Sequence, residues 1–191
     1  QDNLKEIPFN NTKVYTKTFL FGTDKFGRDV LSRIIVGSRI SFYIGFVSVF
    51  ISLVIGIFLG SLAGYYYGII DTIIMWIINI VWSIPTLLLV IAISIALGKG
   101  VWQVFLAVGL TMWVEVARLV RGQVKQYKER KFVVAAKVIG LSDMKIIFRH
   151  IIPNLTSSLI VISATNFAAS ILIESGLSFL GIGVQPPMSS W

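Results

Sequence analysis

Four stretches of this chain contain no charged side chain, and three of them are long enough to cross a lipid bilayer. They cover residues 40–70, 72–98, 100–114 and 151–173, which is 31, 27, 15 and 23 residues. A helix needs about 20 apolar residues to cross ~30 Å of hydrocarbon. Only 14% of all residues are charged, against about 25% in soluble domains. The pattern therefore predicts a polytopic, all-α membrane protein.

We predict spanning helices at 40–64, 70–97, 101–120 and 155–175. The third reaches full length only if it includes Glu115. Residues 1–39 form a polar to amphipathic segment, 121–154 a charged connection, and 176–191 a tail with glycine and proline. Because the chain starts without Met and ends abruptly, we expect it to be part of a longer protein.

The basic residues predict the orientation. The net charge is +8, and nine of the 17 Lys and Arg residues lie between Arg118 and Arg149. Cytoplasmic loops of membrane proteins are enriched in these residues, which favours a cytoplasmic 121–154. Arg28, Arg33 and Arg39 form a smaller, competing cluster before the first span.

The composition argues against several chemistries. The chain has no cysteine and one histidine, His150, and its carboxylates are scattered. This excludes disulfides and thiolate metal sites, and it supplies no convergent catalytic set. We therefore expect neither an enzyme nor a metal site.

The connection 121–154 has a pattern of its own. Phe132, Ala136 and Gly140 share one face of a short helix. Gly140 suits a left-handed helix end, while Ser142 suits the cap of a second helix with Asp143 in its first turn. Pro153 discourages a helix through Ile152.

Two interpretations compete with a protein-docking role for this connection. A basic helix-turn-helix over 132–150 would bind DNA, and a solvated loop would merely follow the charge rule. The small side chains favour close approach by a protein instead. A stand-alone secondary transporter is a further alternative, although such proteins show internal repeats and buried mid-span charges.

The pattern Ala135-Ala136-x3-Gly140-x9-His150-x-Ile152-Pro153 resembles the signature loop of ABC importer permeases. Val134 stands where that signature has Glu, a departure that matches the oligopeptide/dipeptide/nickel branch. Three further blocks resemble the same branch, namely Gly22-Thr23-Asp24 through Arg33, Ala117-Arg118-x-Val120-Arg121-Gly122, and Glu174-x2-Leu177-Ser178-Phe179-Leu180-Gly181 continuing through Pro186, Pro187 and Trp191.

The resemblance implies a type I ABC importer fold of six helices, of which this chain would lack the first and the last. It places 1–39 outside and 121–154 inside a bacterial cytoplasmic membrane. It implies a second permease subunit, two ATPase subunits that hold ATP and Mg²⁺, and an external binding protein, with no cofactor on this chain and no nucleic acid. Peptides are the implied substrate, with nickel left open. The loop residues that would dock on the ATPase are Val134, Ala135, Ala136, Lys137, Gly140, Ser142, Asp143, His150 and Pro153.

Other polar or helix-breaking residues are candidates for the translocation path: Glu115, Asn79, Pro85 and Glu174. Glu115 has a simpler alternative, an interfacial ion pair with Arg118. Before the first span, the motif Gly22, Asp24, Gly27, Arg28 and Asp29 predicts an external gate or subunit contact. It lacks the Gly-Lys-Ser/Thr of a nucleotide loop. Gly45, Gly56, Gly60 and Gly64 predict close helix packing.

Overall fold

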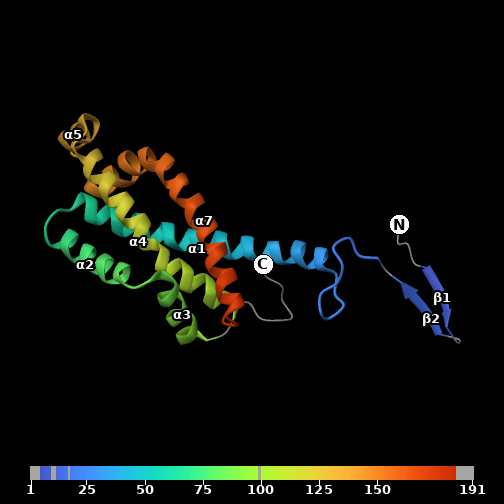
Figure 1. The fold of residues 1–191 in the computed structure, drawn as a ribbon. Helices are drawn as coiled ribbons and strands as arrows, with labels where there is room; N and C mark the ends of the chain where they lie inside the picture. Colours follow the sequence, from blue (N-terminus) through green and yellow to red (C-terminus); the bar gives the residue numbers. More distant parts are fainter. Residues whose placement is uncertain (1–4, 10–11, 17, 99, 184–191) are drawn as a thin grey trace.

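The computed structural model describes residues 5–9, 12–16, 18–98 and 100–183. The C-terminal motif positions Pro186, Pro187 and Trp191 lie outside the described residues. An antiparallel hairpin of β1 (Lys5–Phe9) and β2 (Thr12–Thr16) opens the chain, with Ile7 opposite Val14. Figure 1 places this hairpin beyond the start of the first helix, away from the helical bundle. The sequence analysis described this stretch as polar to amphipathic and did not predict a hairpin.

Helix α1 (Val30–Tyr65) packs along α4 (Val101–Lys128), and this pair forms the centre of the fold (Figure 1). Gly56, Gly60 and Gly64 lie one turn apart on α1 and face α4. A Cβ atom on Gly60 would lie 2.5 Å from the Ala117 carbonyl oxygen. The backbones therefore meet at distances that only glycine permits, and the predicted close packing is confirmed.

The stretch predicted as one span at 70–97 is two helices, α2 (Ile69–Ser83) and α3 (Thr86–Leu97). The two are bent by 93°. Pro85 follows the extended residue Ile84 at the break. Proline has no backbone N–H and disfavours helical geometry in the residue before it, which accounts for the break.

Helix α4 continues eight residues beyond the predicted end at 120, to Lys128. Its charged last turns are held by α2, because Asp71 accepts hydrogen bonds from Arg121 Nε at 2.5 Å and from Lys125 Nζ at 2.9 Å. Arg121, Lys125 and Lys128, which were predicted in the connection, thus lie on α4. A consequence is that Glu115 sits in the middle of α4 rather than near its end.

The connection after α4 contains α5 (Lys131–Val138), α6 (Asp143–Ile146), a π-helical turn η1 (Ile147–Ile151) and a 3₁₀ turn η2 (Ile152–Leu155). Helix α7 (Thr156–Phe179) follows and crosses α1 (Figure 1). Within the described residues, three helical stretches are long and apolar enough to cross a membrane, or four if the bent pair is one span. The positions of the span boundaries remain predictions.

Candidate functional site

Helix α5 has one face inside the protein. Val133 is fully buried and Ala136 is 5% exposed. Both belong to a hydrophobic cluster with residues of α1, α4, α6 and the turns that follow: Tyr65, Val116, Val120, Val124, Ile146, Ile147, Ile151 and Leu155. Ala136 therefore makes its close contacts within the chain. This corrects the expectation that it meets a partner directly.

The opposite face of α5 is open and apolar. Val138 is 82% exposed and Ile139 is 79% exposed, and Val134 and Ala135 are exposed beside them. Together with Glu129 and Lys131 these residues line a shallow groove of about 440 Å³. We call Val134, Ala135, Val138 and Ile139 the α5 face. Sequence reasoning included Val134 and Ala135 but missed Val138 and Ile139, because it followed the positions of the signature pattern.

The turn after α5 has the predicted geometry at Gly140, whereas the predicted cap at Ser142 is only partly formed. Gly140 has φ +85° and ends the helix in the left-handed region. Ser142 occupies the N-cap position of α6, but its side chain makes no capping hydrogen bond. The neighbouring Asp143 reaches α1 instead, where its carboxylate accepts a hydrogen bond of 2.6 Å from the Tyr65 hydroxyl.

Tyr65 joins three parts of the chain at one point. Its ring is 2% exposed, and its backbone carbonyl accepts a hydrogen bond of 2.6 Å from Lys128 Nζ on α4. The Lys137 ammonium lies 5.4 Å from the ring centroid, within the range of a cation–π attraction. The α5–α6 connection is therefore fixed to the ends of both central helices through Tyr65.

We expect Tyr65→Phe to loosen the connection. It removes a hydrogen bond to a charged group, which contributes about 1.5–3 kcal/mol. Backbone amides of 139–146 should exchange faster with deuterium, while those of 105–115 should not change. Tyr67→Phe is the matched control, since Tyr67 is exposed and its ring contacts with Lys125 and Lys128 survive the change. Equal exchange in the two variants would contradict the assignment.

The last part of the connection is held by side chains that donate hydrogen bonds to backbone carbonyl groups. Asn154 Nδ2 donates a 2.7 Å hydrogen bond to the His150 carbonyl oxygen, and the Tyr127 hydroxyl donates one of 3.3 Å to the Asn154 carbonyl. Pro153 was expected to break the helix at Ile152, but Ile152 keeps helical angles of φ −54° and ψ −42°, and the helical path continues from α6 into α7. Pro153 lies in the first turn of the 3₁₀ helix η2, where its missing N–H removes no regular helical hydrogen bond. His150 thus shapes this turn through its carbonyl group.

A second candidate region is a cavity of about 270 Å³ beside the break between α2 and α3. Helices α4 and α7 complete its wall. Glu115 lines it, as does Asn166 of α7, a residue that sequence reasoning did not single out. An amide in the middle of the apolar run 151–173 was the available signal.

The other predicted path residues do not line this cavity. The Asn79 side chain accepts a 2.7 Å hydrogen bond from Arg118 Nη2, and the Arg118 guanidinium stacks 3.3 Å from the Trp82 ring centroid. Arg118 is thus held by α2 rather than by Glu115, which contradicts the expected ion pair. Glu174 is fully buried and accepts hydrogen bonds from Ser41 on α1 and Ser178.

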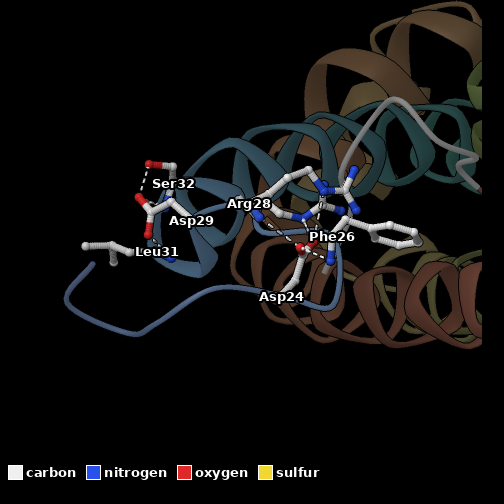
Figure 2. A network of polar contacts seen from close by, with 7 residues as sticks. Asp24, Phe26, Arg28, Asp29, Leu31 and Ser32 are labelled. Carbon is white, nitrogen blue, oxygen red and sulfur yellow. Dashed lines mark hydrogen bonds and ion pairs between the residues drawn. The ribbon is translucent and has the colours of Figure 1, made fainter. Parts of the chain in front are cut away.

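The motif before α1 is a self-contained turn (Figure 2). Asp24 Oδ1 accepts hydrogen bonds from the backbone N–H groups of Phe26 at 2.8 Å and Arg28 at 3.0 Å, and Oδ2 accepts one from Arg28 Nε at 2.9 Å. Gly22 and Gly27 adopt positive φ angles in it. These donors face a carboxylate of the chain itself, so the turn has a structural role in starting α1.

Asp29 begins α1 as its N-cap. Its carboxylate accepts hydrogen bonds from the backbone N–H groups of Leu31 and Ser32 (Figure 2). Two of the four N–H groups that a helix start leaves without partners are thereby satisfied. Asp24 and Asp29 together set the position and direction of the first span.

Hydrogen bonding, first from the Arg28 backbone N–H and also from its side chain, holds the pKa of Asp24 below its usual value of 3.8. A lowered pKa stabilises the turn above pH ~3.8, and that stabilisation is lost as the pH falls through the folded-state pKa. We expect carboxyl NMR of ¹³C-aspartate-labelled protein in detergent to give a midpoint below 3.8 for Asp24. Asp24→Asn assigns the signal. A midpoint at or above 3.8 would contradict the turn geometry.

Comparisons with known proteins agree with this architecture. Residues 56–191 match the family model of the binding-protein-dependent transport system inner membrane component. The oligopeptide transport system permease protein OppC of Bacillus subtilis is 40% identical over 95% of this chain and 60% of its own length. The glutathione transport system permease protein GsiD of Escherichia coli is 44% identical over 90% of this chain and 56% of its own.

The dipeptide transport system permease protein DppC of Bacillus subtilis is 42% identical over 90% of this chain and 53% of its own length. The chain thus spans between half and two thirds of the curated relatives it matches. Its fold resembles a chain of the inward-facing MetNI methionine ABC transporter, with a TM-score of 0.70 at 19% identity, covering 80% of this chain and 76% of that one. This likeness confirms the all-helical importer fold.

The family match covers well over half of the sequence, and its description places these proteins in the inner membrane. The chain therefore belongs to the inner membrane components of binding-protein-dependent transport systems.

Proposed function

We propose that this chain is the greater part of one transmembrane permease subunit of an ATP-driven peptide importer. The observation that carries the proposal is the α5 face. It is an apolar surface of four exposed residues on a short helix. The opposite face of the same helix packs against α1 and α4. A partner that binds this face would move both central helices with it.

The partners follow from the family and its relatives. A second permease subunit would complete the path, an external binding protein would deliver the peptide, and two ATPase subunits would bind ATP and Mg²⁺. In this arrangement 121–154 lies in the cytoplasm, and 1–39 and 176–191 lie outside. This chain itself would hold no nucleotide. The named relatives transport oligopeptides, dipeptides and glutathione, which supports short peptides as substrates.

Two states of the ATPase pair would select two states of the permease. Such a switch requires contacts that differ between the states. Movement of the α5 face would reach α1 through Tyr65 and Asp143, and α4 through the cluster of Val120, Val124 and Val133. Packed elements of this kind shift as rigid bodies rather than deforming continuously.

The DNA-binding alternative loses its support. The face of α5 that would pack in a DNA-binding core is already occupied by this chain's own helices.

Uptake by the assembled importer tests the proposal. The full-length subunit, its partner subunits and the binding protein are reconstituted in liposomes, and entry of a radiolabelled dipeptide is followed. We expect uptake only with ATP, Mg²⁺ and the binding protein together. Uptake driven by an ion gradient without ATP would overturn the proposal in favour of a secondary transporter.

A further inference from the structure

The cavity beside the broken helix has a polar wall in an apolar setting. Ile84 and Thr86, on either side of Pro85, line it from the break, while Glu115 and Asn166 line it from α4 and α7. Discontinuous helices line the substrate sites of many secondary transporters, where the break exposes backbone groups to a ligand. Its volume of about 270 Å³ is slightly below the ~300–1,000 Å³ of usual small-molecule sites. The cavity therefore has room for one end of a short peptide.

Asn166 is a buried amide that lacks a partner. The residue is 1% exposed, and neither its Oδ1 nor its Nδ2 makes a hydrogen bond within the part of the chain that the structure describes. Buried polar groups are nearly always paired, and leaving one unpaired is costly. Asn166 thus offers two donor hydrogens and an acceptor at the cavity wall.

Glu115 brings a carboxylate to the cavity wall. Among residues 5–9, 12–16, 18–98 and 100–183 it makes no ion pair, although Arg118 lies one turn away. Arg118 is instead bonded to Asn79 and stacked on Trp82. Asp71, by contrast, is paired with two cations. Glu115 is exposed in this chain and lies on a helical stretch that is apolar enough to cross a membrane, where ionisable groups are usually functional.

The hydroxyls of the cavity add further acceptors. Thr111 donates its proton to the Val108 carbonyl at 2.8 Å, and Thr165 donates to the Val161 carbonyl at 3.1 Å. Each oxygen keeps lone pairs that can accept. The wall thus combines a carboxylate and several acceptors with one amide donor. Its complement is a protonated amine next to a carbonyl oxygen.

We infer that this cavity binds the amino end of a peptide during its passage. Glu115 takes the ammonium group, and the Asn166 amide donates to the first peptide carbonyl. The inference rests on the proposed function, because it assumes that peptides pass through this subunit. It adds a recognition site inside the membrane, separate from the external binding protein.

Cysteine protection in the assembled importer, held in nanodiscs without the binding protein, tests the site. Thr165→Cys places a thiol on the cavity wall, and Ser157→Cys places one on an exposed position of α7 outside this cavity. Alanyl-alanine at millimolar concentration should slow maleimide labelling at 165 at least threefold and leave 157 unchanged. N-acetyl-alanyl-alanine, which lacks the ammonium group, should not protect.

Glu115→Gln should raise the half-protecting concentration of alanyl-alanine about tenfold or more, and Glu115→Asp should restore part of the effect. No protection in the parent, equal protection by the acetylated dipeptide, or full protection in Glu115→Gln would overturn the site. ATP-driven uptake is measured with the same subunits. Normal uptake without protection removes only this inference, whereas loss of ATP-dependent uptake in the parent removes the proposed function.

Discussion

Gly60→Leu is expected to abolish assembly of the folded subunit. Even the first added atom, a Cβ, would lie 2.5 Å from the Ala117 carbonyl oxygen and 2.9 Å from Val120 Cβ. Backbone atoms cannot yield as a flexible side chain does, so α1 and α4 would have to separate. Adding a few methylene groups to a packed interior lowers folding stability by about 1–3 kcal/mol. A whole leucine side chain at Gly60 should lower it by more. Fluorescence-detected size exclusion in detergent measures the loss.

Gly122→Ala is the matched control for this variant. Gly122 is also a helical glycine, on α4, but a Cβ there would meet no atom within 4 Å. Alanine is favoured over glycine in helices by about 1 kcal/mol, so the control should keep or slightly raise the thermal midpoint. A Gly60→Leu protein that elutes and melts like the parent would show that α1 and α4 do not pack as described.

Val138→Asp is expected to stop transport while leaving the subunit folded. Val138 is 82% exposed, so a carboxylate there remains solvated in the isolated subunit. In an assembled importer the same carboxylate would be buried against the ATPase without a partner. Disrupting a central interface residue of this kind weakens binding by at least ~2 kcal/mol of free energy. Co-purification of the ATPase should fall by more than tenfold, with ATP-dependent uptake falling in parallel.

Val138→Thr has nearly the same shape and no charge, and it should keep most of the ATPase binding. Both variants should have the thermal midpoint of the parent subunit. Undiminished co-purification with Val138→Asp would remove Val138 from the docking surface. A lowered thermal midpoint in that variant would instead show that the residue belongs to the core.

Much of the fold was predictable because a helix that crosses lipid needs a long stretch of uncharged, mostly apolar residues. Uncharged runs located helices near 40–64, 101–120 and 155–175, and Gly140 marked a real left-handed turn. The end of α4 could not be predicted from charge. Arg121 and Lys125 lie within the helix, where both donate hydrogen bonds to Asp71, which is about fifty residues earlier in the chain. Only tertiary structure reveals such pairs.

The candidate sites were predictable in outline and not in detail. The signature pattern located the α5 connection, but helical spacing alone did not reveal that Ala136 faces inward while Val138 and Ile139 face outward. Glu115 was predicted as a path residue from its place in an apolar stretch, and it lines the cavity. Asn166 became significant only when its amide proved to be buried without a partner beside that acid.

The central claim is that the α5 face docks on an ATPase subunit, and neighbouring residues allow a direct test. Ala135 is exposed and Ala136 is buried, and this chain has no cysteine of its own. Cysteines placed at either position in the full-length subunit are tested for disulfide formation with cysteines on the ATPase surface. The account predicts efficient cross-linking at 135 that changes with ATP, and little at 136. Absence of cross-linking at 135 across several ATPase positions in an assembled complex, or equal cross-linking at 136, would contradict it.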